Sequence, residues 1–344
     1  MKPPTAQAVA ACHLESTKHL QGQQRRGDGT MRNWKRSAIL AGILVGFGTG
    51  AANAEPFIPP GDTPLFTQLV NAEQLSPSNS IDTPSGDTEG NWGIFQVSSI
   101  QEGFVATDEK DVTGGGETLF ADRALPADSP GQITGIFHGL QVEDVTNTNG
   151  SALIDSSGGQ IDLYWDEAGL DGGDTLVEIG DGTNLPGDRT ADDQYNGFTD
   201  GIFLGTLELA PGVIDGDATT TVRGSFDSST DIGSGSADGY ADVADVNGDG
   251  VIDSADGLWA STLNSNWFRV DLDGDGVDET PRDIRFSNET NGMASWDGEG
   301  DVVGLRSSDP LRAVTVPEPG MLGLMGAGLV LLAMASARRR LGAF

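Results

Sequence analysis

Short runs of alternating apolar and polar residues fill the middle of the chain. Ile161, Leu163 and Trp165, for example, stand at every second position. Alternation with a period of two, bounded by Gly, Asp, Asn and Pro clusters, predicts half-buried strands. The predicted strands are residues 92–100, 132–142, 160–166, 175–179, 198–209 and 219–226. No long helical pattern separates them, which favours a mainly β fold, either an antiparallel β-sandwich or a barrel-like body.

One segment ahead of these runs has helical spacing instead. Thr63 can cap a helix and Pro64 suits its first position, and Leu65, Leu69 and Ala72 then fall on one face. The spacing therefore predicts a short helix that ends near residue 75.

The segment 31–54 has the order of a secretory signal peptide. Three basic residues precede an apolar run at 38–47, and small residues follow up to Ala52 and Ala54. This charged, apolar and Ala-x-Ala order predicts recognition by the secretion translocon and cleavage after Ala54. The alternative, an uncleaved membrane anchor, is disfavoured by the short apolar run. We expect residues 1–30 to be an extension upstream of the natural start.

A second uncharged apolar stretch, residues 321–337, lies near the other end and is just long enough to cross a bilayer. Pro317, Glu318 and Pro319 precede it, and Arg338, Arg339 and Arg340 follow at once. Arginines beside a membrane segment stay on the cytoplasmic side, so the body is expected on the outer side. The sequence thus predicts a C-terminal transmembrane helix.

Residues 316–340 resemble the PEP-CTERM sorting signal, which joins Pro-Glu-Pro, a transmembrane helix and a basic cluster. The resemblance implies recognition by an exosortase, a membrane transpeptidase, through Pro317, Glu318 and Pro319. It further implies transient anchoring in the inner membrane, cleavage near the Pro-Glu-Pro, and transfer to the cell surface or extracellular matrix. The alternative is a permanent C-terminal anchor.

Negative charge is concentrated in the body of the chain. Residues 55–320 hold fifty acidic and nine basic residues, and the whole chain has a formal net charge of −33. Such a body repels nucleic acid and anionic lipid but attracts cations. The only cysteine, Cys12, lies in the segment expected to be removed, so no disulfide framework is available. Core packing or bound ions must supply the stability.

Residues 245–256 place oxygen atoms where a calcium loop needs them. Gly250 stands at position 6, where the loop turns sharply, and the apolar Ile252 at position 8 can pack inward. The expected ligands are Asp245, Asn247, Asp249, the carbonyl of Val251, Asp253 and Asp256. Position 12 is Asp256 where an EF-hand has Glu, and in this the loop resembles a dockerin-type loop, with residues 258–264 as its helix.

A second acidic run begins at Asp271 and matches the same pattern at positions 1, 3, 5, 6 and 9. Its expected ligands are Asp271, Asp273, Asp275 and Glu279. Position 12 is Arg282, which cannot bind a cation, so Asp278, Glu279 or Asp283 would have to substitute. Dockerins bind a cohesin through two paired loops, and the faulty second loop argues against such binding. The alternative for both runs is an Asp-Gly turn; with Ca²⁺ bound, the ion would be structural.

No catalytic constellation stands out. His138 is the only histidine after Ala54, which makes Ser-His-Asp and Cys-His machinery hard to assemble, and we interpret it as a half-exposed strand residue. Asp162, Asp166 and Glu167 are the candidates for a two-carboxylate hydrolase, and we interpret them as the solvent face of a strand. We therefore expect no enzyme.

The predicted organisation is a β-rich domain at 55–226, a Gly/Ser/Asp linker at 227–244, a calcium-loop region at 245–315 and the sorting signal at 316–340. The favoured function is a non-catalytic surface or matrix protein held among extracellular polysaccharide. The alternatives are a carbohydrate-binding or dockerin-like interaction module and a secreted carboxylate-dependent hydrolase. A carbohydrate-binding module would need exposed aromatic side chains among Trp92, Trp165, Trp259, Trp267 and Trp296.

Overall fold

The computed structural model describes residues 55–105, 112–122, 131–148, 151–167, 179, 184–227 and 234–316. The chain divides at residue 50, and all of these residues belong to the unit 51–344. The expected signal peptide with Ala52 and Ala54, the stretch 321–337, and the residues of the sorting signal from Pro317 to Arg340 lie outside the described ranges. Within those ranges, none of the helices has the length and apolar character needed to cross a membrane.

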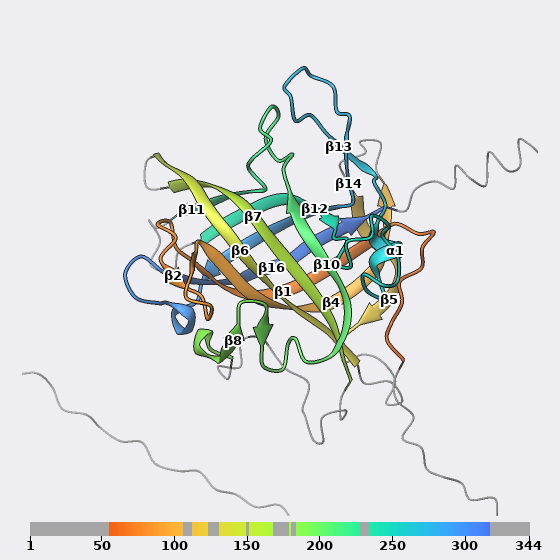
Figure 1. Cartoon of the computed structure of the whole chain (residues 1–344), viewed down its shortest axis with the longest axis horizontal. Coiled ribbons are helices and arrows are strands. Elements are labelled where there is room, and N and C mark those ends of the chain that lie inside the picture. Colours follow the sequence, from red (N-terminus) through yellow and green to blue (C-terminus); the bar gives the residue numbers. More distant parts are fainter. Residues whose placement is uncertain are drawn as a thin grey trace, which may run out of the picture. The chain divides into compact units, whose positions relative to one another are not determined.

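Ten antiparallel strands form one large sheet (Figure 1). They are β1 (Leu65–Leu75), β4 (Asn91–Val105), β5 (Val112–Ala121), β6 (Gly131–Thr148), β7 (Ser151–Glu167), β10 (Ile202–Ala210), β11 (Val222–Asp227), β12 (Ser234–Val243), β15 (Ile284–Gly292) and β16 (Val303–Thr315). The mainly β, antiparallel prediction is therefore confirmed.

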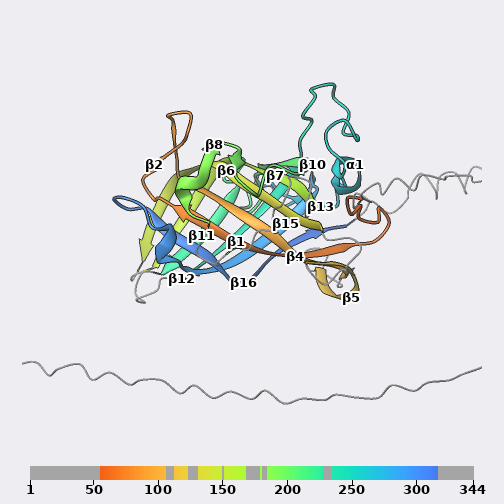
Figure 2. The ribbon, with the colours of Figure 1, turned by 90° about the horizontal axis from the view of Figure 1, so that it is seen from below.

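The strand order bends the sheet into a ring (Figure 1 and Figure 2). The order is β1-β16-β15-β12-β10-β7-β6-β4-β5, and β1 also pairs with β4, so the path returns to its start. β11 pairs with β12 and β7, the same two neighbours as β10. The strand pattern predicts either a β-sandwich or a barrel-like body, and the ring is the barrel-like form.

Short elements connect the strands of the ring. Three small hairpins are β2 (Ile81–Asp82) with β3 (Thr88–Glu89), β8 (Arg189–Ala191) with β9 (Gln194–Tyr195), and β13 (Phe268–Val270) with β14 (Thr280–Arg282). One turn of α-helix, α1 (Ala260–Leu263), and two 3₁₀ turns, η1 (Pro186–Asp188) and η2 (Ala294–Trp296), complete the described elements.

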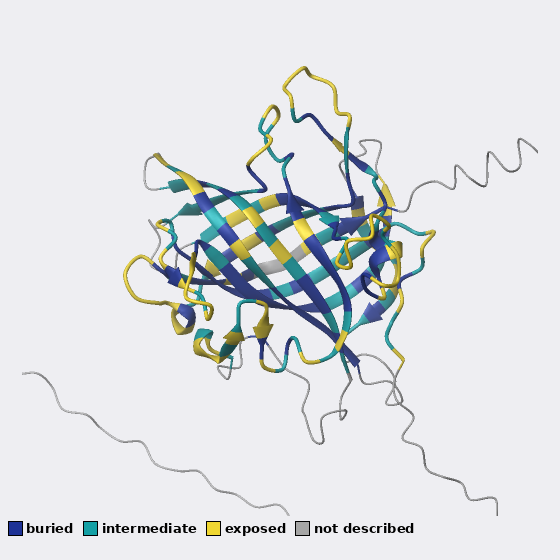
Figure 3. Ribbon diagram, viewed as in Figure 1, coloured by how far each residue is buried: buried dark blue, intermediate teal, exposed yellow. Residues whose placement is uncertain are grey.

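The alternation of side chains along the strands separates an inside from an outside. Figure 3 shows this as alternating buried and exposed bands on the ribbons. Leu163 of β7 and Leu207 and Leu209 of β10 belong to the main buried cluster. Because neighbouring side chains of a strand point to opposite faces, burying one set inside the ring defines the register of the pairing.

A second buried cluster covers part of the outer face. Trp92, Tyr195 and Trp296 pack together there, with ring centroids 5.4–6.4 Å apart. The guanidinium of Arg189 lies 4.4 Å from the Trp92 ring and forms a buried ion pair with Glu89. The segments around β8 and η2 therefore bury the outer side of β1 and β4. The inner side of these strands is buried in the interior of the ring.

The helix expected after Pro64 is wrong, because residues 65–75 form β1. β1 pairs with β4 along one edge and with β16 along the other. Leu65 and Leu69 are four residues apart, a spacing that places them on one face of a strand as well as of a helix. Ala72, which a helix would place on the same face, instead belongs to a different buried cluster, because residues at odd spacing lie on opposite faces of a strand.

The linker expected at 227–244 is also wrong, because residues 234–243 form β12 inside the sheet. β12 pairs with β11 and β10 on one side and with β15 on the other. Its small residues have a packing reason: a Cβ added at Gly239 would lie 2.3 Å from the Phe286 ring. β15 and β16 complete the same ring, so the calcium-loop region is no separate domain.

The other strand predictions are largely confirmed. The runs at 92–100, 132–142, 160–166, 198–209 and 219–226 overlap β4, β6, β7, β10 and β11 in that order. Of the run 175–179 only Ile179 is described, and it is buried in a turn.

Candidate functional site

The first acidic loop, residues 245–256, is wrapped around the carboxylates at its two ends. The Asp245 carboxylate accepts hydrogen bonds from the backbone N–H groups of Gly248 (2.8 Å) and Gly250 (2.6 Å). The buried Asp256 carboxylate accepts from Asn247 (3.1 Å) and Asp253 (3.0 Å), and these backbone donors lower its pKa. The loop therefore has a defined shape, with Asp249 and Asp253 on its exposed side.

This first loop is fastened to the ring through the residues beside it. Ile252 packs against the main buried cluster, as its apolar position predicts. Trp259 is buried; its backbone N–H donates to Leu204 (2.8 Å) and its indole N–H donates to the Phe57 carbonyl (2.7 Å). The helix expected at 258–264 is present as the single turn α1.

The second acidic loop connects β13 to β14 and brings three carboxylates together. Oxygen atoms of Asp271, Asp273 and Asp275 all lie within 4.8 Å of one another, so this partly exposed group could bind a metal ion. Asp271 is buried, and its carboxylate accepts the N–H groups of Gly274 and Gly276, each at 2.7 Å. Strands flank this loop on both sides, whereas a dockerin-type loop is followed by a helix.

Glu279 joins this group electrostatically. Desolvation raises the pKa of its carboxyl, and the charges of Asp273, Asp275 and Asp271 raise it further. Arg282 at position 12 turns away, donating to the Pro211 carbonyl (2.8 Å) and to Asp242 (3.1 Å).

The Asp283 carboxylate is hydrogen-bonded outside the loop, so it does not replace Arg282 as a ligand at position 12. Its carboxylate accepts the backbone N–H groups of Val243 (2.9 Å) and Asn266 (2.7 Å). The loop itself is held by Gly216, whose N–H donates to the Asp271 carbonyl at 3.0 Å.

His138 is engaged with a strand neighbour. Its Nε2 lies 3.2 Å from the Asp162 carboxylate, whose second oxygen accepts the Thr206 hydroxyl. Asp162 is buried, so the prediction that it lies on the solvent-exposed face of its strand is wrong. Asp166 is partly buried, and the side chain of Glu167 lies outside the described residues.

The tryptophans of the body do not form an exposed platform. Trp92, Trp165, Trp259 and Trp296 are buried, and Trp267 is partly buried. The feature that a stacking carbohydrate site requires is therefore missing from these five residues.

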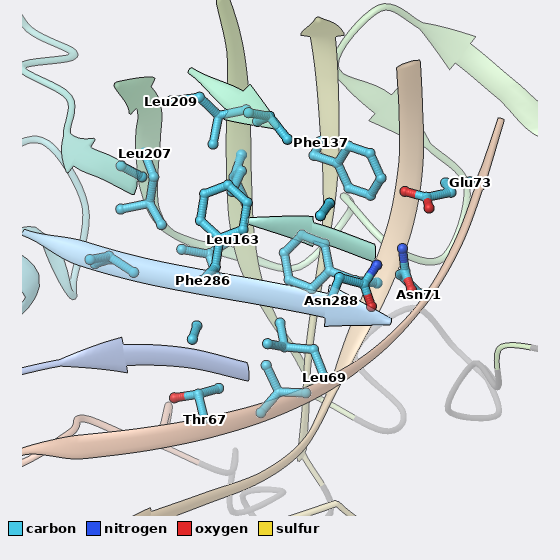
Figure 4. Close-up of a pocket in the computed structure, with 18 of the residues that line it drawn as sticks. Thr67, Leu69, Asn71, Glu73, Phe137, Leu163, Leu207, Leu209, Phe286 and Asn288 are labelled. Carbon is cyan, nitrogen blue, oxygen red and sulfur yellow. The ribbon is translucent and has the colours of Figure 1, made fainter. Parts of the chain in front are cut away.

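The interior of the ring holds a cavity of about 130 Å³ that the strand pattern did not predict. Leu163, Leu207 and Leu209 line one side, and Asn71, Glu73 and Asn288 bring polar groups to the other (Figure 4). Asn71 and Glu73 stand at alternate positions between Leu69 and Leu75, so they interrupt an apolar face of β1. That interruption was the available sequence signal, hidden by the helical interpretation.

Glu73 is a buried acid, and the pKa of its carboxyl is set by burial and by one hydrogen bond. Burial raises the pKa of its carboxyl to about 7, and a hydrogen bond from Asn91 opposes the shift. The carboxyl is therefore neutral in mildly acidic solution and charged above neutral pH.

Comparison with known proteins identifies the tail and nothing else. The family model of the PEP-CTERM protein-sorting motif matches residues 315–340. No curated protein and no solved structure matches the chain. The motif marks an exported protein that an exosortase processes and that is sorted to the cell surface, in agreement with the resemblance drawn from Pro317, Glu318 and Pro319.

Glu73 should make the folded body less stable as the pH rises. Its folded-state pKa of about 7 exceeds the ordinary value of 4.5, so the protonated acid stabilises the fold below pH 4.5 and this stability is lost through pH 7. Glu73→Gln should remove about 3 kcal/mol of that pH-dependent loss. Urea unfolding from pH 4.5 to 8 measures it.

The exposed Glu289→Gln on β15 is the matched control and should keep the wild-type slope. Equal slopes for wild type and Glu73→Gln would show that Glu73 does not titrate inside the ring.

Proposed function

We propose that this chain is an exported, non-catalytic protein of the cell surface or extracellular matrix. A C-terminal tail anchors it in the inner membrane until an exosortase processes it, and Ca²⁺ in the acidic loops stiffens the body among extracellular polysaccharide. The PEP-CTERM motif at 315–340 is the single observation that carries this proposal.

The junction between body and tail supports processing of a folded protein. The motif begins at Thr315, the last residue of β16, which pairs with Leu65 of β1 and with Ile284 of β15. Val316 is buried against the body. A cut near the Pro-Glu-Pro would therefore leave every strand of the ring in place.

The calcium part of the proposal rests on the carboxylates of the second loop. Like charges this close repel one another, and a hard divalent cation relieves the repulsion. Asp271 is already held by two backbone donors, which leaves Asp273 and Asp275 to close on the ion. The first loop offers Asp245, Asn247, Asp249, Val251, Asp253 and Asp256 for the same purpose.

A non-catalytic role is consistent with the engagement of the described candidate groups. The Asp162 carboxylate is occupied by His138 and Thr206, so it is poorly placed to act as an acid or nucleophile.

Replacing the Pro-Glu-Pro should block processing of the tail. Pro317→Ala combined with Glu318→Ala should leave full-length protein in the inner-membrane fraction of a host that carries an exosortase, because the recognised residues are gone. Intact-mass spectrometry of the surface and membrane fractions gives the C-terminus in each case.

Glu299→Ala, an exposed glutamate on the body, is the control and should be processed normally. Normal processing of the double variant would contradict exosortase recognition through these residues.

Calcium should raise the melting temperature of the body. At a free Ca²⁺ concentration of about 100 Kd the folded state gains about 2.7 kcal/mol, which calorimetry resolves as a shift of several degrees relative to a chelator. Asp275→Asn should remove most of the shift if the second loop binds, and Asp249→Asn reports on the first loop.

The exposed Asp87→Asn makes the same charge change away from both loops and should retain the full shift. An identical melting temperature in millimolar Ca²⁺ and in chelator would disprove structural calcium binding.

A further inference from the structure

The cavity inside the ring is divided into an apolar part and a polar part. Leucine, isoleucine, valine and phenylalanine side chains from several strands make up most of its wall. The polar part consists of Asn71 and Glu73 of β1, Asn91 of β4 and Asn288 of β15, four side chains from three strands (Figure 4 labels three of them).

This polar part is no opening to solvent. The exposed fractions of Asn71, Glu73 and Asn288 are 1%, 7% and 5%. Leu75, two residues beyond Glu73 on the same face of β1, belongs to a further buried cluster with Val142, Ile154 and Leu305. The polar groups thus lie between two apolar regions, where water is a poor competitor for their hydrogen bonds.

Three atoms of this group have no hydrogen-bond partner among the described residues although they are buried. They are Asn71 Nδ2, Asn91 Oδ1 and Asn288 Oδ1. Asn71 is fixed by its other atoms, since its backbone N–H donates to the Ser307 hydroxyl (3.0 Å) and its Oδ1 accepts from the same hydroxyl. Buried polar atoms are nearly always satisfied, so unpartnered ones around a cavity require a partner that the described side chains do not supply.

The missing group must be rich in donors. Two unpartnered amide oxygens and the Glu73 carboxylate can accept hydrogen bonds, while one amide NH2 group, that of Asn71, remains to donate. A primary ammonium carries three N–H donors and a charge that compensates a buried carboxylate.

Among the described residues of β1, β4, β15 and β16, no cation performs this role at Glu73. β1 has no other charged residue, and the only one on β4, Glu102, pairs with Leu65 at the far end of the strand. Arg306 of β16 and Glu289 of β15, the nearest charged residues along those strands, are exposed. These four strands therefore supply no positive charge to the ionised carboxylate, and a bound ligand can supply it.

The cavity volume limits the size of the apolar part. A protein cavity of about 150 Å³ lined by apolar side chains binds benzene. The volume of about 130 Å³ therefore suits a ring or short chain of similar size, with its amine directed at the asparagines.

We propose that the ring of strands binds a small primary amine with a compact apolar body, its ammonium held by Glu73, Asn91 and Asn288. This binding activity is independent of the sorting tail and of calcium, and it gives the exported body a ligand of its own.

Benzylamine is the probe, and toluene and benzyl alcohol are its neutral counterparts of nearly equal shape. Titration calorimetry on the whole protein at pH 8 should show benzylamine binding at least about tenfold tighter than benzyl alcohol, the value of one charge-assisted hydrogen bond. Glu73→Gln should reduce the benzylamine affinity by about tenfold or more and leave that of benzyl alcohol within about twofold.

Two further variants keep the test independent of folding defects. Glu289→Gln makes the same change on the exposed face and should bind benzylamine like the wild type. Leu207→Phe fills the apolar end and should weaken all three probes, with circular dichroism confirming the fold. Equal affinity for benzylamine and benzyl alcohol, tighter binding of toluene than of either, or no binding of any probe would each overturn the proposal.

Discussion

β1 forms hydrogen bonds along both of its edges, with β4 on one side and β16 on the other, and this double pairing makes the sheet a ring. Without one of these pairings, β1 and the strand it had lost would each leave a row of unpaired backbone groups, which is a site for aggregation. The closure also sets the ends of the body side by side, because Leu65 at the start of β1 pairs with Thr315 at the end of β16. Gly93 allows the close approach of β4 to β1, since a Cβ there would lie 2.5 Å from the Ala72 carbonyl oxygen.

Closure of the ring creates both an interior and an exterior, and the candidate sites are distributed between them. The interior carries the cavity and the buried Glu73. The acidic loops lie in connections between strands. Ile252 and Trp259 hold the first loop against the ring, and a hydrogen bond from Gly216 to Asp271 holds the second. The sorting motif begins where the last strand ends. Export, ion binding and ligand binding would therefore use separate parts of one fold and can be tested separately.

The sequence predicted the strands whose two faces differ most. The alternation at Ile161, Leu163 and Trp165 is clear because β7 has one face toward the core. The pattern predicts a helix at β1 because both faces of the strand are buried from Asn71 to Leu75, so this part has no exposed side. The pattern predicts a linker at β12 because glycine, serine and alanine give little hydrophobic signal, although Phe286 needs the small Gly239 opposite it. The tail and the acidic runs were visible because their residues are contiguous. The cavity was not, because Asn71 and Asn288 are over two hundred residues apart and meet only through the ring.

Hydrogen exchange of the β1 amides, followed by mass spectrometry of peptides covering residues 65–75, tests closure of the ring most directly. If β1 pairs along both edges, its amides should exchange as slowly as those of β4 and β6, and far more slowly than those of the loop at 211–221. Rapid exchange throughout β1, with β4 and β6 still protected, would show an open sheet and would remove the basis for the interior cavity.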